Sequence, residues 1–173
     1  LIAVMVSAAA FTYQTKHEAE SWLSEVRRLE REIRFEEDTM DLLKADWGVE
    51  SDLWGCPSMN ELARNGIDTQ RWNLLHPLEE PKLSHVEQKL AGAKGPVVAA
   101  TDYIKLFSEQ IRPFVKAPYV TLGTDGFGRS DTREKLRHHF EVDRHWVTLA
   151  ALKALADSGE VKREVVAAAL VKY

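Results

Sequence analysis

Cysteine is nearly absent from this sequence, and its scarcity argues against two kinds of stabilising site. Cys56 is the only cysteine among 173 residues. One thiol cannot form a disulfide within the chain, and no Cys/His cluster at ligand spacing supports a structural zinc site. No histidine lies near Cys56 in the sequence, so we expect a buried spectator rather than a nucleophile. We expect a reducing, cytoplasmic location.

Basic residues do not outnumber acidic residues in this chain. The chain has 23 Lys and Arg against 27 Asp and Glu, a net charge of −4. This balance argues against a nucleic-acid partner, whose phosphates require neutralisation. Residues 1–47 hold six basic and ten acidic residues, whereas residues 48–173 hold seventeen of each. The length suits one domain with an appendage, and the charge difference places a boundary near 47/48.

Charge is wholly absent from residues 1–13, LIAVMVSAAAFTY. A bilayer span needs roughly 20 apolar residues, so this run is short. It fits the end of a truncated transmembrane helix, a signal-peptide core or a buried element, although a signal peptide would need a basic start. Membrane contact is expected only through these residues. Because the chain starts at Leu1 rather than Met, we expect a piece of a longer protein or a processed product.

Glycine and proline are missing between His17 and Trp47, which predicts one long helix over 17–47. Its apolar residues follow heptad spacing with one polar interruption: Trp22, Val26, Leu29, Ile33, Met40, Leu43 and Trp47. The spacing favours a coiled coil over an amphipathic helix packed on a globular body.

The phrases AFTYQTKHEAE and VRRLEREIRFEEDTMDLLKADW follow one another within residues 1–47. They resemble FtsL-type bacterial cell-division proteins, which are short single-span proteins whose periplasmic coiled coil pairs with a septal partner. The resemblance implies an alternative function for the chain: a division protein anchored in the inner membrane, with an unrelated C-terminal extension.

Apolar runs and helical patterns alternate after Gly48. We predict strands over 52–54, 97–100, 119–122 and 145–148, and helices over 59–65, 84–90, 102–112, 131–140, 149–157 and 162–171. This alternation indicates an α/β domain with a mainly parallel sheet. Thr101-Asp102 and Ser130 or Asp131 are predicted to cap the helices that follow them, and Ser158-Gly159 to end one.

A glycine-rich run, Leu122-Gly-Thr-Asp-Gly-Phe-Gly-Arg-Ser-Asp131, follows the 119–122 strand. It lacks the dinucleotide fingerprint, and Asp125 and Asp131 would repel a phosphate at the next helix. We expect a structural turn with positive φ, in which Arg129 and Arg133 pair with the two aspartates.

The histidines give no catalytic or metal site. His138 and His139 point in different directions on a helix, and His138 is expected to form a solvated pair with Glu134. His76 has no visible partner for a general base. We assign no catalytic, cofactor-binding or metal residue. Nine residues are structural or interface candidates: Asp125, Gly126, Phe127, Gly128, Arg129, Asp131, Arg137, His138 and His139.

Three long phrases carry a second resemblance: DWGVESDLWGCPSMNELARNGIDTQRWNLLHP, VVAATDYIKLFSEQIRPFV and YVTLGTDGFGRSDTREKLRHHFEVDRHWVTLAAL. Residues 44–173 resemble the C-terminal domain of the homodimeric bacterial pyruvate dehydrogenase first component. The resemblance implies a transketolase C-terminal fold, a sheet flanked by helices. It also implies an enzyme between glycolysis and acetyl-CoA biosynthesis that oxidatively decarboxylates pyruvate and acetylates lipoyl groups. Its partners would be a second copy and the acyltransferase of the complex.

That family uses thiamine diphosphate and Mg²⁺, which its two preceding domains hold through a Gly-Asp-Gly motif with a downstream Asn. Here Thr124-Asp125-Gly126 lacks that pattern. The resemblance therefore implies a domain for packing and dimer contacts that is not catalytic alone and binds no cofactor.

The two resemblances meet near Trp47-Gly48, so the chain looks like a chimera. A domain without its first strand would leave a sheet edge or a gap. Either Leu1–Ala10 fills that place or the domain is less stable than its parent. The end of the long helix, with Leu43 and Trp47, is placed to supply helical cover.

Overall fold

The computed structural model describes residues 20–24, 26 and 38–173. The elements follow in the order α2 (Met59–Leu75), α3 (His85–Leu90), β1 (Val97–Ala100), α4 (Leu106–Glu109), the 3-10 helix η1 (Arg112–Phe114), β2 (Tyr119–Leu122), α5 (Arg133–His139), α6 (Arg144–Asp157) and α7 (Arg163–Lys172). Residues 20–24, 26 and 38–47 are also helical. The apolar run at 1–13 and the heptad positions Leu29 and Ile33 lie outside the described residues, whereas Trp22 and Val26 are exposed.

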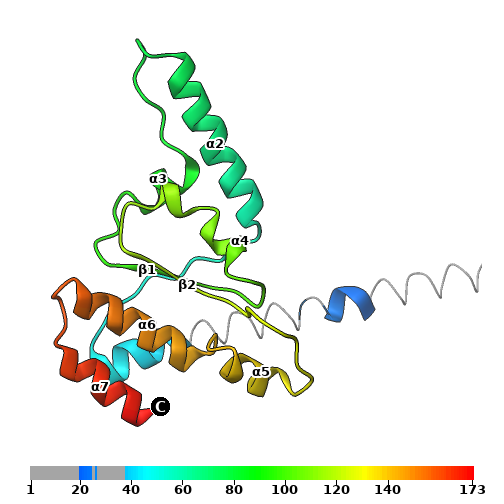
Figure 1. Ribbon diagram of the computed structural model, residues 1–173, viewed down its shortest axis with the longest axis vertical. Helices are drawn as coiled ribbons and strands as arrows, with labels where there is room; N and C mark the ends of the chain where they lie inside the picture. The colour runs from blue at the N-terminus through cyan, green and yellow to red at the C-terminus, as the bar shows by residue number, and fades with distance from the viewer. Residues whose placement is uncertain (1–19, 25, 27–37) are drawn as a thin grey trace, which may run out of the picture.

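The sheet has two parallel strands, β1 and β2, paired from Val97↔Tyr119 to Ala100↔Leu122. Both strands cover the predicted ranges to the residue, and the predicted α/β fold with a parallel sheet is confirmed. Figure 1 shows the strands near the middle of the molecule, with α2, α3 and α4 towards one end and α5, α6 and α7 towards the other.

Two predicted strands are wrong. Residues 52–54 have no regular structure, and residues 145–148 belong to α6. Asp143 begins this helix, because its carboxylate accepts hydrogen bonds from the backbone N–H groups of His145 and Trp146. A short apolar run does not distinguish a strand from a buried helix turn, and the cap decided the outcome here.

The helix boundaries differ from prediction in two places. α2 continues ten residues past the predicted end at 65, through Gly66, which packs against the ring of Phe114. The helix predicted over 102–112 shortens to α4 and η1, with Pro113 inside η1, and no side chain caps α4. Thr101-Asp102 is therefore not a helix cap.

The starts of α3 and α5 and the end of α6 lie close to their predicted positions. Thr132, rather than Ser130 or Asp131, caps α5 through its side chain. α6 ends at Asp157, followed by Gly159 with φ of 82°, as Ser158-Gly159 predicted. α3 starts with a reciprocal capping box between Ser84 and Glu87, where a helix over 84–90 was predicted.

The first hydrophobic core lies between the sheet and the helices at the α2 end. Its buried members are Ala63, Val86, Ile111, Phe114 and Tyr119. The Tyr119 hydroxyl donates a hydrogen bond to the carbonyl oxygen of Ser108 at 2.8 Å, which satisfies the phenol inside the core.

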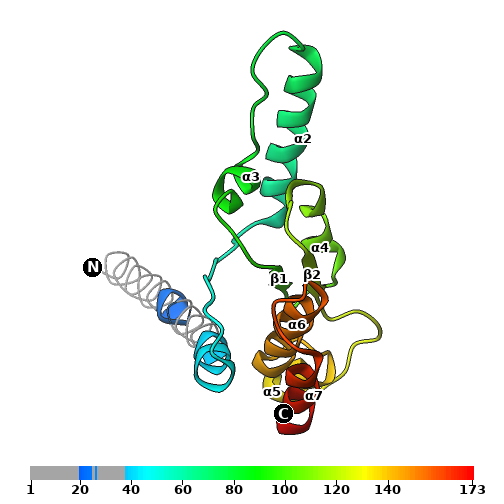
Figure 2. The ribbon, with the colours of Figure 1, turned by 90° about the vertical axis from the view of Figure 1, so that its left-hand side faces the viewer.

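The second core joins the helix at 38–47 to α6 and α7. Its buried members are Leu43, Leu149, Leu152 and Ala169, and Trp47 packs against them. Figure 2 shows the helical segment 38–47 and α7 at the same end of the molecule as α6. The prediction that Leu43 and Trp47 supply helical cover is confirmed.

Within the described stretches, no helix is long and apolar enough to cross a membrane.

Candidate functional site

The candidate site lies where the two parallel strands end. The loops after β1 and β2 are tied together, because the Thr124 N–H donates to the Tyr103 carbonyl oxygen at 2.8 Å. The Thr124 hydroxyl also donates to the Asp102 carbonyl oxygen at 2.9 Å. In open α/β sheets, ligands and partners meet the carboxyl ends of the strands, so this edge is the natural place for a site.

Two glycines allow the chain to turn there. A Cβ on Gly123 would lie 2.6 Å from the Lys105 nitrogen and 2.7 Å from the Tyr103 oxygen, both backbone atoms. Only glycine fits between the two loops at this position. Gly126 has φ of 101°, which confirms the predicted turn with positive φ.

Asp125 holds the turn through Lys105 rather than through an arginine. One carboxylate oxygen accepts a hydrogen bond from the Lys105 N–H at 3.0 Å, and the other lies 3.7 Å from the Lys105 Nζ. Asp131 accepts from the Thr132 N–H at 2.7 Å and lies 3.8 Å from the Lys135 Nζ. The predicted pairing of Arg129 and Arg133 with these aspartates is therefore wrong.

The arginines of α5 meet Asp102, directly after β1. Arg137 binds it with two hydrogen bonds, at 2.9 Å from Nε and 2.8 Å from the guanidinium tip, and Arg133 adds a third at 3.0 Å. Burial alone would raise the pKa of Asp102, but the hydrogen bonds and charges of Arg137 and Arg133 outweigh it and hold this pKa below its usual range. Arg137 thus fixes α5 against the end of β1.

The two histidines separate, as predicted from their adjacency. His138 Nδ1 lies 2.9 Å from the Asp143 carboxylate, at the start of α6, rather than near Glu134. The His139 ring packs edge-on against Phe140, with centroids 5.0 Å apart. Among the residues that the structure describes, no three His, Cys, Asp or Glu side chains lie close enough to hold a metal ion.

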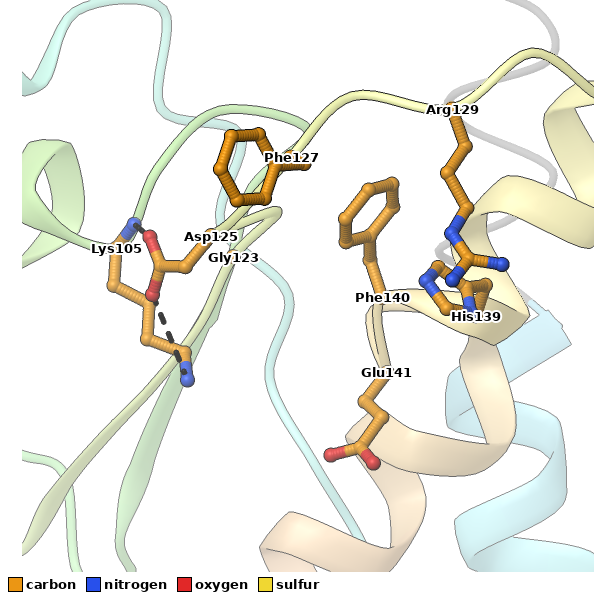
Figure 3. A pocket seen from close by; sticks show the side chains of 8 residues that line it. All are labelled: Lys105, Gly123, Asp125, Phe127, Arg129, His139, Phe140 and Glu141. Carbon is orange, nitrogen blue, oxygen red and sulfur yellow. Dashed lines mark hydrogen bonds and ion pairs between the residues drawn. The ribbon is translucent and has the colours of Figure 1, made fainter.

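A pocket of about 330 Å³ opens at this edge (Figure 3). Its lining comes from the two strand-end loops and the end of α5: Lys105, Gly123, Asp125, Phe127, Arg129, His139, Phe140 and Glu141. Figure 3 shows Arg129 alongside the His139 ring, and the rings of Phe127 and Phe140 among the lining side chains. Glu141 has φ of 60°, an uncommon conformation for a residue other than glycine.

Large apolar side chains are exposed on the loops and the short helix that follow the two strands. Phe127 is 97% exposed. Four further exposed apolar residues follow β1 in the sequence. Together with Phe127 we call them the strand-end surface: Tyr103, Ile104, Leu106, Phe107 and Phe127. Exposed apolar patches of this kind mark contacts with protein partners, and the cations beside them suit a polar rim. The arrangement fits an interface better than a reaction centre.

Sequence reasoning found the glycine loop but missed the residues that hold it. Asp102 and Lys105 were assigned to a helix, although their position after a strand could have placed them beside the loop after the neighbouring strand. Phe140 and Glu141 gave no signal, because the turn after α5 brings them to the pocket.

Two further residues lie away from this edge. Cys56 is exposed, so the prediction of a buried residue is wrong, and its sulfur lies 3.4 Å from that of Met59. Desolvation by neighbouring atoms raises the pKa of the Cys56 thiol, which disfavours a nucleophile. His76 Nδ1 lies 2.8 Å from the Trp72 carbonyl oxygen, and its ring stacks on Trp72.

Comparisons with known proteins agree on one relationship. The profile of the family described as "Transketolase-like TK C-terminal domain" matches residues 31–143. The pyruvate dehydrogenase E1 component of Cupriavidus necator is 71% identical over 133 residues, which are 77% of this chain and 15% of the relative. The E1 components of Pseudomonas aeruginosa and Escherichia coli K12 are 56% and 51% identical over 142 residues, or 82% of this chain and 16% of each relative.

This chain thus spans about 15–16% of the length of the curated relatives that it matches. The family match starts at residue 31, inside the segment 1–47 that the sequence set apart. It therefore includes the helical residues 38–47, which pack into the second core.

Proposed function

This chain belongs to the transketolase-like C-terminal domain family, and we propose that it serves as the C-terminal domain of a pyruvate dehydrogenase E1 component. The 71% identity over 133 residues carries this proposal. The domain acts by packing and by contacts between two copies. The whole enzyme would oxidatively decarboxylate pyruvate and acetylate the lipoyl groups of its acyltransferase partner.

The domain itself holds no thiamine diphosphate. This cofactor needs oxygen ligands for Mg²⁺ and donors for a diphosphate. Here Asp125 is tied to Lys105, and Asp102 to two arginines, so neither carboxylate is free for a metal. The strand-end residues do not fit the cofactor, whose chemistry is supplied by other parts of the enzyme.

The strand-end surface is the proposed contact for the second copy or for a neighbouring domain. Phe127 and Tyr103 are exposed aromatic side chains of the kind that anchor protein interfaces. Arg129 and His139 line the pocket together with Phe127 and provide hydrogen-bond donors at the rim. Gly123, Asp125 and Asp102 fix the two loops that carry Phe127 and Tyr103. The two aromatic side chains are therefore positioned before a partner binds.

A hybrid enzyme tests the proposal. The aligned segment of the Escherichia coli E1 component is replaced by residues 31–173 of this chain. Pyruvate oxidation with the cofactor and acyltransferase is then measured, and the mass is determined by sedimentation. We expect a dimer with at least a tenth of the parent activity. A hybrid that folds and binds the cofactor but stays monomeric and inactive would contradict the proposed role.

Calorimetric titration of the unmodified 173-residue chain tests the second part of the proposal. We expect no heat of binding from thiamine diphosphate with Mg²⁺ and no release of CO₂ from pyruvate. Micromolar binding would show that this domain contains a cofactor site.

For the N-terminal part we infer a domain boundary near residue 31, where the family match begins, instead of 47/48. The likeness of the preceding residues to an FtsL-type protein and their coiled coil stay predictions, which rest on the sequence phrases and heptad spacing. We infer a cytoplasmic location for the chain, which the free thiol of Cys56 supports, since a reducing compartment preserves it.

A further inference from the structure

The C-terminal half of α2 projects from the molecule as an arm. Figures 1 and 2 both show this end of α2 far from the sheet, with the chain returning from it towards α3. The buried residues of α2, Ala63 and Gly66, both lie in its first half. None of residues 67–75 is buried. The first half of the helix therefore belongs to the first core, whereas Trp72 and Asn73 in the second half contact the loop that follows the helix.

Apolar side chains gather on one side of this arm and at its tip. Ile67, Leu74 and Leu75 are separated by seven and eight positions, which places them on one face of the helix. They are 60%, 78% and 60% exposed, and Leu78, in the loop after the helix, is 99% exposed. We call these four residues the arm surface. Exposed apolar side chains gathered at a protruding end mark a contact with a partner.

The tip is held rigid although it projects. The Asn73 side chain donates to the Lys82 carbonyl oxygen at 2.9 Å and accepts from the Lys82 N–H at 2.8 Å. The Trp72 ring lies between His76, stacked with centroids 4.2 Å apart, and the Lys82 ammonium, 3.5 Å from the ring centroid. These contacts close the loop at its base. A preorganised loop loses little conformational freedom when its exposed leucine is buried by a partner.

The charge at the tip indicates the chemistry of that partner. Within residues 74–81 the only Asp, Glu, Lys or Arg side chains are Glu79 and Glu80, and the next residue, Lys82, has its ammonium over the Trp72 ring. Both carboxylates are exposed, and neither forms an ion pair with another described residue. A partner that buries Leu78 brings its own rim beside these carboxylates, so a basic rim is favoured and an acidic one is disfavoured. Contact between the tips of two copies would bring four carboxylates together, which argues against self-association here.

We infer that the arm docks on the remainder of a pyruvate dehydrogenase E1 component, in an apolar pocket bordered by Lys or Arg; this inference rests on the proposed function. More than four-fifths of each relative's length lies outside the matched segment, and on the proposed function this part of the enzyme is the partner available to the arm. The arm is distinct from the strand-end surface, because β1 and β2 lie at the other end of α2 (Figure 1).

Hydrogen exchange of the unmodified chain and of the hybrid E1 component described above tests the inference. We expect the backbone amides of residues 74–80 to exchange at least tenfold more slowly in the hybrid. The double variant Leu74→Ser/Leu78→Ser should lose that protection in the hybrid and leave the unfolding temperature of the unmodified chain unchanged. Glu79→Lys/Glu80→Lys should also weaken the protection. The matched control is Val171→Ser, which changes an 89% exposed side chain on α7 and should leave exchange at 74–80 unaffected.

Equal exchange at 74–80 in the two proteins would overturn the docking inference. If an active, dimeric hybrid showed this result, the proposed function would stand and only the docking inference would fail. If the hybrid does not fold, a second experiment tests the inference. The residues of the Cupriavidus necator E1 component that align with Leu74 and Leu78 are replaced by serine, and the stability and activity of that enzyme are measured. Unchanged thermal stability and activity of that enzyme would overturn the inference, whereas a lowered unfolding temperature would support it.

Discussion

The helix at 38–47 and the end of α2 are both amphipathic, yet only one of them is packed. Leu43 is 4% exposed and lies among α6 and α7, whereas Leu74 of α2 is 78% exposed. The difference shows that an apolar stripe predicts a contact but does not say whether the contact lies within the same chain. The first helix has its partner in this chain, and the second, on our proposal, has its partner elsewhere.

Polar contacts reinforce the packing of the first helix. The Trp47 indole N–H donates to the Tyr173 hydroxyl at 3.0 Å, which in turn donates to the Asp46 carboxylate at 2.8 Å. Lys172 lies 2.6 Å from the other Asp46 oxygen and, with the Tyr173 hydrogen bond, lowers the pKa of Asp46. These contacts join residues 126 or 127 positions apart in the sequence. These contacts support our inference that helix 38–47 belongs to the domain.

The largest expected effect separates the two helices directly. Leu43→Ala should reduce the free energy of unfolding by about 2–5 kcal/mol, because it leaves a cavity in the second core. Leu74→Ala should change it by less than about 0.5 kcal/mol in the unmodified chain, because the side chain is exposed. Urea unfolding followed by circular dichroism measures both. Similar losses in the free energy of unfolding for the two variants would contradict the claim that only the first helix is packed within this chain.

The glycine turn gives the next largest effect. Gly126→Val should cost about 1–3 kcal/mol of stability, because φ of 101° is strained for a β-branched residue. Arg129→Ala should cost less than about 0.5 kcal/mol, since no ion pair or hydrogen bond holds this side chain within the described structure. Thermal unfolding of both variants checks this. A loss of stability of about 1 kcal/mol or more in Arg129→Ala would instead support the pairing with an aspartate that the sequence predicted.

The pH dependence of stability probes the link between the sheet and α4. Hydrogen bonds from Arg112 and Thr121 lower the pKa of Glu109 to about 2 from 4.5. Because the folded pKa is depressed, the stabilisation is complete above pH 4.5 and is lost as the pH falls towards 2. After allowance for exposure to water, about 1 kcal/mol is expected. Unfolding of the wild type and Glu109→Gln between pH 2 and 6 measures it, with Glu79→Gln as an exposed control. Parallel pH profiles for wild type and Glu109→Gln would contradict the assignment.

The smallest expected effect concerns the hydrogen bond between Trp47 and Tyr173. Trp47→Phe replaces the indole by a smaller ring and removes the N–H that reaches Tyr173, and the hydrogen bond should account for about 0.5–1 kcal/mol of its cost. Tyr173→Phe should cost a similar amount, and the double variant should cost less than the sum of the two. A double-mutant cycle by urea unfolding tests this coupling. Strict additivity would show that the hydrogen bond contributes nothing.

The strands predicted at 97–100 and 119–122 match β1 and β2 in the structure, because each is a short apolar run bounded by turn residues. The prediction failed at 145–148, where the Asp143 cap makes the run the first turn of a helix. Propensity over four residues is a weak signal, and a cap overrides it.

The candidate site was predicted in part for a different reason. Gly126 and the separation of His138 from His139 follow from local backbone rules, which sequence carries. The partners of Asp125 and Arg137 do not, because Lys105 and Asp102 lie 20 and 35 positions away in the sequence. Which loop meets which depends on the pairing of β1 with β2, and that pairing is a property of the fold.

One measurement tests the central contrast most directly: hydrogen exchange of the unmodified chain at increasing urea, read at residues 40–47, at 149–152 of α6 and at 70–75 of α2. We predict that 40–47 and α6 share one opening free energy and the same dependence on urea, because one core holds them. Residues 70–75 should open with a much smaller free energy. If 40–47 instead exchange as fast as 70–75 while α6 stays protected, the helix is an appendage and its place in the transketolase-like domain is contradicted.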